Sequence, residues 1–263
     1  MQNEILEQMM EADMLLIGLG EEFDNERLFR DSEQYRRMRK WFEDTNKEWL
    51  LPAYQDMLRA GQDHLLRETL CKFSEILKDK NYFVVTTSTN RVISQIPWRE
   101  GRFVAPCGNG WRKQCIRGCV EGLSELKEAE EEALYALFHS MEKGTAEPGE
   151  VGAILGKCPL CGEELIFNNI YTSSYDEKGY LEQWSVYTKW LQGTLNRRLF
   201  ILELGVGMQC PTVIRFPFEK VAYYNQKAFL CRVNGTLYHL TENLREKGCS
   251  ISENSVDWLH FLC

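Results

Sequence analysis

Four cysteines in two close pairs constrain this chain more than any other feature of its sequence. Cys115 and Cys119 are spaced C-x3-C, and Cys158 and Cys161 are spaced C-x2-C within the stretch CPLCG, whose proline and glycine favour a tight turn. Two such pairs supply four soft sulfur ligands, the set that tetrahedral zinc binds in structural sites. We therefore expect zinc on these four residues. Four thiolates leave no open position for a substrate, so the expected role of the metal is structural.

The remaining cysteines are expected to be free thiols in a cytoplasmic protein. The chain has ten cysteines, and its amino terminus, MQNEILEQMMEADMLLIG, carries acidic residues where a signal peptide would carry lysines. No apolar run approaches the roughly 18 residues of a membrane span. A reducing compartment favours thiols and metal thiolates over disulfides. The net charge of -8 argues against broad binding to nucleic acid or to acidic membranes, so a small molecule or a protein is the expected partner.

Short apolar runs alternate with helical stretches along the chain. Strands are predicted at 14–17, 82–85 and 103–105, and in the apolar parts of RRLFILELGVG and KAFLCRVN. Helices are predicted at 5–11, over much of 25–80, and at 121–143. Strands separated by helices indicate a parallel sheet with crossover helices. The expected fold class is α/β, a Rossmann-like parallel sheet with an inserted small zinc-binding module and a helical insertion.

The order of these motifs resembles that of the sirtuins, NAD-consuming enzymes with a Rossmann fold and an inserted zinc module. One strand ends in Gly-x-Gly, a second precedes a cluster of Thr, Ser and Asn, and a third leads to Pro-Cys-Gly before the four zinc cysteines. Two further strands end in a glycine turn and in Val-Asn. The likeness covers most of the chain, and residues 33–78 fit it least. The segment LELGVGMQCPTVIRFPFE is similar to the macrodomain-linked branch, whose members are protein ADP-ribosyltransferases.

The resemblance implies that NAD or ADP-ribose binds along the carboxyl ends of the strands, where open α/β sheets place their ligands. Gly18 and Gly20 would let the phosphates approach the backbone, and Ser88 and Asn90 would lie near the nicotinamide ribose. Gly205 and Gly207 would form the opposite turn, and Asn234 would meet the adenosine ribose. The complete set of nucleotide-binding residues that the resemblance implies is Gly18, Gly20, Glu21, Thr86, Gly205, Gly207 and Asn234.

Two departures from the sirtuin pattern concern the nucleotide pocket. Glu21 and Glu22 follow the two glycines, and carboxylates beside a pyrophosphate repel it. We expect these two side chains to point away or to bind a sugar hydroxyl, while the helix start still offers amide donors to a phosphate. The family's T-x-N-x-D motif, whose Asn and Asp line the nicotinamide and ribose pocket, reads Thr86, Ser88 and Asn90 here.

A third departure places Cys107 at the position of the family's catalytic histidine. In deacetylation by family members this histidine accepts a proton from a ribose hydroxyl, a task suited to a pKa near 7. A thiol with a pKa of about 8.5 performs it only if its pKa is lowered. We therefore expect no lysine deacetylation, whereas cleavage of NAD or transfer of ADP-ribose depends mainly on pocket geometry and exclusion of water. Cys107, Ser88 and Asn90 are the candidate catalytic residues.

The same pattern predicts the domains and leaves three functions open. Residues 1–32, 80–106 and 195–263 are expected to form a Rossmann-like NAD-binding domain, residues 33–79 a helical insertion, and residues 107–194 a zinc-binding small domain. The first hypothesis is an NAD-dependent enzyme, either an ADP-ribosyltransferase acting on a protein substrate or an NAD-cleaving enzyme. The second is a catalytically impaired sensor that binds NAD or ADP-ribose. The third is a zinc-stapled interaction module without a nucleotide.

Overall fold

Contacts within the chain divide it into two compact units. The computed structural model describes residues 2–119, 123–146 and 149–263. Unit 1 comprises Met1–Asn25, Gly61–Cys107 and Tyr180–Cys263, and unit 2 comprises Glu26–Ala60 and Gly108–Gly179. Each unit therefore draws its residues from separate parts of the sequence.

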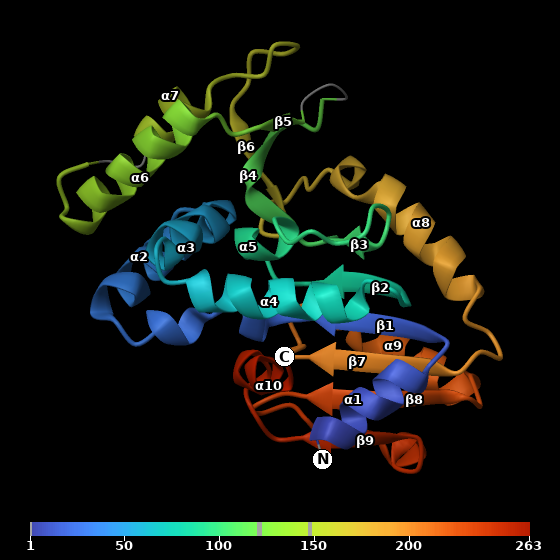
Figure 1. The fold of residues 1–263 in the computed structure, drawn as a ribbon. Helices are drawn as coiled ribbons and strands as arrows, with labels where there is room; N and C mark the ends of the chain where they lie inside the picture. Colours follow the sequence, from blue (N-terminus) through green and yellow to red (C-terminus); the bar gives the residue numbers. More distant parts are fainter. Residues whose placement is uncertain (1, 120–122, 147–148) are drawn as a thin grey trace. The chain divides into compact units, whose positions relative to one another are not determined.

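Unit 1 contains a six-stranded sheet in the order β3-β2-β1-β7-β8-β9, whose strands run across the view in Figure 1. Every adjacent pair is parallel. The strands are β1 (Met14–Leu19), β2 (Asn81–Thr86), β3 (Phe103–Val104), β7 (Leu199–Leu204), β8 (Ala228–Val233) and β9 (Gly248–Ile251). This arrangement confirms the predicted Rossmann-like parallel sheet.

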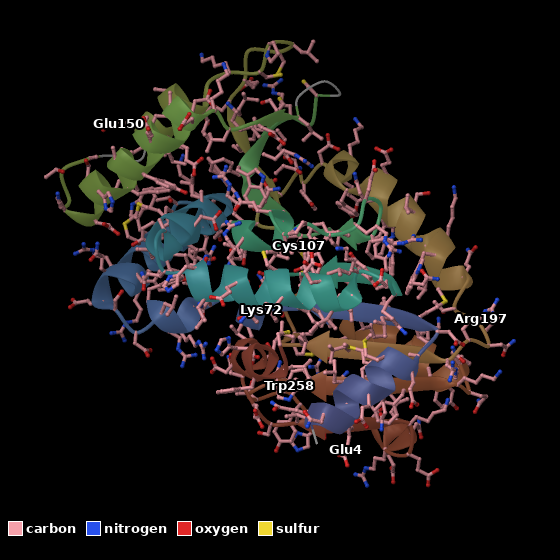
Figure 2. The ribbon with its side chains drawn as sticks, in the orientation of Figure 1. Glu4, Lys72, Cys107, Glu150, Arg197 and Trp258 are labelled. Atoms are coloured by element: carbon pink, nitrogen blue, oxygen red, sulfur yellow. The ribbon has the colours of Figure 1, made fainter. Side chains whose placement is uncertain are left out.

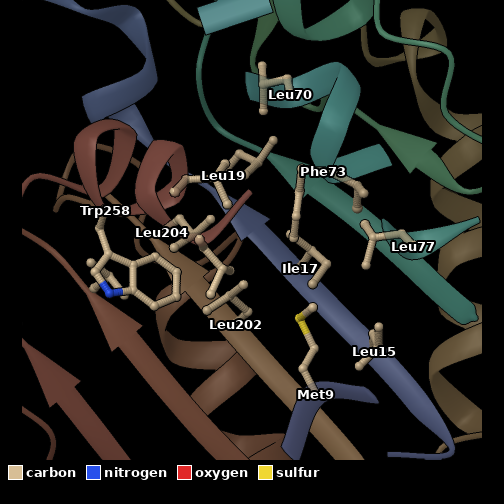
Figure 3. Packing of buried hydrophobic residues seen from close by; sticks show 14 of the residues in the cluster. Met9, Leu15, Ile17, Leu19, Leu70, Phe73, Leu77, Leu202, Leu204 and Trp258 are labelled. Atoms are coloured by element: carbon tan, nitrogen blue, oxygen red, sulfur yellow. The ribbon is translucent and has the colours of Figure 1, made fainter. Parts of the chain in front are cut away.

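Helices cover both faces of this sheet, which explains why its central strands are apolar throughout. Side chains alternate between the faces along a strand. On one face, Leu15, Ile17 and Leu19 pack with α1 (Gln2–Glu11), α4 (His64–Leu77) and α10 (Ser255–Leu262), as Figure 3 shows for residues such as Phe73 and Trp258. The opposite face is covered by α8 (Leu181–Gln192) and α9 (Arg215–Tyr224), which pack in the same cluster as alternate residues of β1 and β7.

A buried ion pair lies on the second face of the sheet. Glu203 of β7 and Arg232 of β8 are register partners, and both are almost fully buried. The guanidinium donates to both carboxylate oxygens, at 2.7 and 3.0 Å, and also to Glu219 Oε1 of α9 at 2.8 Å. Arg215 lies 3.3 Å from the same carboxylate and donates to the carbonyl of Val206. Burial raises the pKa of Glu203, so the carboxylate depends on these two guanidinium groups to remain charged.

Unit 2 combines a small antiparallel sheet with helices. Its strand order is β5-β4-β6, from β4 (Gly108–Cys115), β5 (Ser124–Glu125) and β6 (Leu165–Asn169). Its helices are α2 (Glu33–Asp44), α3 (Leu51–Arg59), α6 (Glu128–Glu142) and α7 (Glu150–Leu155). Aromatic rings dominate the core: Tyr54 stacks on Tyr35 and meets Phe42 and Phe138 edge-on. Such edge-on pairs add to the stabilisation that comes from burial alone.

Short elements complete the chain. They are η1 (Glu21–Asp24), η2 (Glu26–Leu28), η3 (Glu48–Leu50), α5 (Arg91–Ser94), η4 (Glu177–Gly179) and η5 (Glu242–Leu244). Within the described residues, no helix combines the length and the apolar character needed to cross a membrane.

The observed elements differ from the expected ones in several places. Strands β4, β5, β6 and β9 were not predicted. The helix expected at 121–143 is observed as α6 only from Glu128 to Glu142; strand β5 lies within the expected helical range, and residues 121 and 122 lie outside the described part. The unit bounds also differ from the expected domain bounds. Helix α4, expected within the insertion 33–79, packs with the sheet of unit 1, while the segment Glu26–Ala60 clusters with the zinc-cysteine segment.

The buried ion pair generates a stability prediction. Replacing Arg232 by Met leaves Glu203 buried with only part of its compensating charge, so we expect Arg232→Met to lower the free energy of unfolding by about 3–5 kcal/mol. The double variant Glu203→Leu/Arg232→Met should recover part of this loss, because the buried Glu203 carboxylate is removed, while Arg215 and Glu219 each lose one charged partner. Urea denaturation measures both. The exposed Arg197, labelled in Figure 2, gives a control in Arg197→Met, which should change stability by less than about 0.5 kcal/mol. An Arg232→Met variant as stable as this control would contradict the expectation.

Candidate functional site

The four predicted zinc ligands form one cluster within unit 2. The sulfur atoms of Cys115, Cys119, Cys158 and Cys161 all lie within 4.8 Å of one another, and the Sγ atoms of Cys115 and Cys161 are 3.5 Å apart. Zinc–sulfur bonds of about 2.3 Å in a tetrahedron separate the sulfurs by a little under 4 Å. The donor set and its spacing therefore fit one tetrahedral zinc ion.

Local backbone structure positions these thiols. Cys115 ends β4, and the Gly118 amide donates to its carbonyl at 2.9 Å, which forms the turn towards Cys119. Gly162 has a φ of 75° and donates to the Cys158 carbonyl at 2.9 Å, which closes the second turn. The Arg117 amide lies 3.4 Å from Cys115 Sγ, and such N–H groups stabilise thiolate charge.

In unit 1, the predicted polar residues after β2 lie at the carboxyl end of the strand. Thr86 Oγ1 donates to the carbonyl of Leu19 at 2.9 Å and accepts the amide of Ser88. Ser88 Oγ donates to Asp24 Oδ1 at 2.7 Å. Asn90 caps α5 by accepting the amide of Val92 at 2.9 Å, and its Nδ2 donates to the Phe23 carbonyl and to Asp63. Ser88 and Asn90 are buried, and their side chains are engaged within the unit.

The predicted glycines make close approaches within unit 1. A Cβ on Gly18 would lie 2.7 Å from Ile214 Cγ2 and 2.8 Å from the ring of Phe218, so this glycine makes room for α9. A Cβ on Gly20 would lie 2.3 Å from the Val206 Cα, so this position admits only glycine. Gly205 has a φ of 64°, in the left-handed region that glycine adopts without strain. The strand ends are thus held together by backbone contacts that a side chain would break.

The two acidic residues after β1 turn towards backbone amides. Glu21 Oε2 accepts the Gly207 amide at 2.5 Å. Glu22 Oε1 accepts the Gly235 amide at 2.8 Å, and its Oε2 accepts the Ser255 amide at 2.7 Å. These partners follow β7, β8 and β9 respectively, so one pair of carboxylates links the carboxyl ends of three strands to the end of β1.

Asn234, the last predicted nucleotide-binding residue, follows β8 and holds two neighbouring loops. Its Nδ2 donates to the Val206 carbonyl at 3.1 Å, and its Oδ1 accepts the amides of Thr236 and Leu237 at 2.9 and 2.7 Å. The structure therefore brings Gly20, Glu21, Gly205, Gly207 and Asn234 to one edge of the sheet.

Cys107 lies just after β3, is 1% exposed, and is labelled in Figure 2. Its thiol is hydrogen-bonded to Cys210, which lies in the loop between β7 and α9 and is partly exposed. This hydrogen bond and burial raise the pKa of Cys107, and the nearby carboxylates of Glu21 and Asp24 raise it further. The same hydrogen bond lowers the pKa of Cys210 because Cys107 donates to its sulfur. Cys107 is therefore a protonated thiol at neutral pH.

Sequence reasoning missed Cys210, Asp24 and Ser255. Cys210 follows Gly207 in the turn after a predicted strand, and this shared carboxyl edge was the signal that could have paired it with Cys107. Asp24 follows the two glutamates in the same turn and accepts from the polar cluster after β2. No local pattern identifies Ser255, because its role depends on α10 packing against the turn after β1.

Buried polar atoms without partners are present at this edge. Among the described residues, Glu21 Oε1, Thr87 Oγ1 and Ser255 Oγ are buried and have no hydrogen-bond partner. Buried polar groups are usually hydrogen-bonded. The two hydroxyl groups can donate to a phosphate oxygen and the carboxylate oxygen can accept from a sugar hydroxyl, and a nucleotide such as NAD or ADP-ribose carries both kinds of group.

Solved structures of Sir2 proteins share the fold of this chain. A structure of Sir2Tm bound to a propionylated peptide matches with a TM-score of 0.59 and 13% identity, over 99% of this chain and 96% of that chain. A Sir2 bound to an acetylated peptide matches with a TM-score of 0.56 and 11% identity, over 100% and 97%. A mutant Sir2 homologue in complex with ADP-ribose matches with a TM-score of 0.54 and 13% identity, over 100% and 95%. The chain therefore has the sirtuin fold.

A curated relative adds a distant similarity in sequence. A protein ADP-ribosyltransferase of Staphylococcus aureus (strain Mu50 / ATCC 700699) is 18% identical over 197 residues. The match covers 74% of this chain and 58% of that protein, so the chain spans little more than half the length of this relative. No family model matches the chain.

The cysteine cluster generates a prediction about metal. Purified protein should contain about one zinc per chain, and Cys158→Ser should lose the metal and lower the melting temperature, because the energy of metal binding is folding energy in such modules. Elemental analysis and thermal unfolding with and without a chelator measure the two effects. Cys71→Ser, a cysteine of α4 outside the cluster, should keep the zinc. A fully folded, zinc-free wild type would refute the site.

The thiol pair generates a prediction about pH. Because Cys107 lowers the pKa of Cys210, alkylation of Cys210 by iodoacetamide should reach half its maximal rate at a lower pH than that of an ordinary thiol, whose pKa is about 8.5. In Cys107→Ala the donor is absent, so this midpoint should move to higher pH. Mass spectrometry of alkylated peptides across a pH series measures it. An unchanged midpoint would show that Cys107 does not act on Cys210.

Proposed function

We propose that this chain is a sirtuin-fold enzyme that cleaves NAD and transfers its ADP-ribosyl group to a protein acceptor, rather than a lysine deacetylase. The observation that carries the proposal is the fold match, which spans nearly the whole of this chain and of each Sir2 chain compared, one of them an ADP-ribose complex. The distant similarity to a protein ADP-ribosyltransferase favours ADP-ribosyl transfer as the reaction.

The nucleotide would lie along the carboxyl edge of the unit 1 sheet. NAD would supply the ADP-ribosyl group, and nicotinamide would leave as the bond from its nitrogen to the ribose C1′ breaks. A nucleophile of the acceptor would form the new bond to C1′ and release its proton. The cofactor-binding residues of this proposal are those that the sirtuin resemblance implies: Gly18, Gly20, Glu21, Thr86, Gly205, Gly207 and Asn234.

The state of Cys107 argues against deacetylation. A general base must be unprotonated at the working pH, and its pKa should lie near that pH. The pKa of Cys107 is raised well above that of an ordinary thiol by its hydrogen bond with Cys210 and by burial. The side chain that the resemblance aligns with the family's histidine therefore stays protonated and does not accept a proton at neutral pH. Cleavage of the nicotinamide–ribose bond relies on positioning and electrostatics, and it does not require a base at this position.

Zinc has a structural role in this proposal. Four cysteine ligands would fill its tetrahedral coordination, so the metal would offer no position to a substrate. It would join the end of β4 to the CPLCG turn and thereby stabilise unit 2. Loss of zinc would act on activity through folding.

A second candidate function is binding of NAD or ADP-ribose without catalysis. One observation favours it: Ser88 and Asn90, the candidate catalytic residues after β2, already hydrogen-bond to Asp24, Asp63 and backbone groups. Side chains bound in this way stabilise the loop after β2. A site without reactive groups could still bind a nucleotide and respond to it by a change in the order of this loop.

Nicotinamide release distinguishes these functions. Wild type, Cys107→Ala and Cys107→His are each incubated with NAD, with and without an acetyl-lysine peptide. We expect slow nicotinamide release by wild type, little change in Cys107→Ala, and no deacetylated peptide from either. Loss of a true general base would lower the rate by about 100-fold or more.

Three outcomes decide between the alternatives. Robust deacetylation by wild type that Cys107→Ala abolishes would show that the thiol acts as a base, and would refute the proposal. Three inert proteins that bind NAD tightly in titration calorimetry would favour the sensor. If all three proteins are inert and bind neither NAD nor ADP-ribose, the zinc-stapled interaction module is the remaining hypothesis.

A further inference from the structure

The carboxylates of Glu21 and Glu22 occupy backbone donors of the kind that bind phosphate. The Gly207 and Gly235 amides follow β7 and β8, and the Ser255 amide opens the helix α10. Amides in glycine turns and at helix starts bind phosphate oxygens because they present N–H groups and partial positive charge. All three amides are instead satisfied by carboxylate oxygens of this chain.

The glycines here admit the carboxylates. A Cβ on Gly207 would lie 3.0 Å from Glu21 Oε2, and a Cβ on Gly235 would lie 3.3 Å from Glu22 Oε1. The absence of side chains at these two positions therefore lets the acidic groups approach the amides. The same space would admit the oxygen atoms of a phosphate.

Ser255 gives an independent sign that a ligand belongs here. Its side chain is 0% exposed, and its Oγ has no hydrogen-bond partner among the described residues. This hydroxyl lies 2.4 Å from the position that a Cβ on Gly205 would occupy, so it faces the turn after β7. Glu21 Oε1 is also buried without a partner. A buried donor and a buried acceptor without partners flank the amides that the two carboxylates engage.

We propose that Glu21 and Glu22 are internal competitors that close the anion-binding part of the nucleotide site, so that pyrophosphate groups bind only by displacing them. The inference rests on the proposed function for the identity of the nucleotide. The affinity of the site for phosphate then depends on the free energy needed to break the hydrogen bonds between the two glutamates of η1 and the backbone amides. Repulsion between carboxylate and phosphate adds to this competition.

Binding of inorganic pyrophosphate tests the competition without depending on the nucleotide. Titration calorimetry compares wild type, Glu22→Ala and Glu22→Gln with the matched control Glu253→Ala, which removes one negative charge from an exposed residue near α10. Glu22→Ala frees the amides of Gly235 and Ser255. It should bind pyrophosphate at least about tenfold more tightly than wild type, because one charge-assisted hydrogen bond alone accounts for about that change. Glu22→Gln retains the side-chain length and should fold even if the alanine variant does not. Because it loses only the charge, Glu22→Gln should show a smaller gain in pyrophosphate affinity than Glu22→Ala. Glu253→Ala should bind pyrophosphate with the affinity of wild type.

The outcomes separate this inference from the proposed function. Equal pyrophosphate affinity in wild type and both Glu22 variants, or an equal gain in Glu253→Ala, overturns the competition. A gain confined to the Glu22 variants supports it. Parallel titrations with NAD then test the function: NAD binding by wild type, together with equal pyrophosphate affinity in wild type and both Glu22 variants, leaves the proposed function standing and overturns the inference. Tighter pyrophosphate binding by the Glu22 variants, with no NAD binding by wild type, would support the competition and count against the proposed function.

Discussion

The buried ion pair between Glu203 and Arg232 lies between the strands that carry the candidate site of unit 1. Burying charges is unfavourable unless they are paired and hydrogen-bonded, and here each partner meets the other across adjacent strands. The same group of charges includes Arg215, which donates to the carbonyls of Val206 and Leu237. The loops after β7 and β8 are thus attached to the interior. Arg215 fixes the carbonyls of Val206 and Leu237, so the backbone amides of the same loops face the carboxyl edge in fixed positions.

The sequence predicted those parts of the fold that depend on local pattern. The central strands are continuous apolar runs, because helices cover both faces of the sheet, and such runs are visible without any tertiary information. Strand β4 was missed because GNGWRKQC contains two glycines and two basic residues. One of these, Lys113, is buried through an ion pair with Glu130 at 2.7 Å, a contact that no local pattern indicates. The zinc cysteines were found because their spacing is itself local.

The candidate site was less predictable, because its contacts join distant segments. The sequence indicated that Gly20 and Gly207 follow strands and that two carboxylates follow Gly20. It could not indicate that Glu21 reaches Gly207, a partner far along the chain, and thus takes an amide that the resemblance implies for a ligand. Likewise the position of Cys107 was evident from the motif order, whereas its protonation depends on Cys210, which only the fold brings near.

The order of strands in the unit 1 sheet affects how the chain folds while it is being synthesised. Strand β1 pairs in register with β7, residues 14–19 with residues 199–204, and the whole of unit 2 lies between them in sequence. Long-range parallel pairing is slow to form, and an apolar strand without its neighbour is prone to aggregate. All six residues of β1 are buried in the finished sheet. A nascent chain therefore carries this strand without its β7 neighbour until translation has passed Leu204, and an apolar strand edge is exposed during that interval.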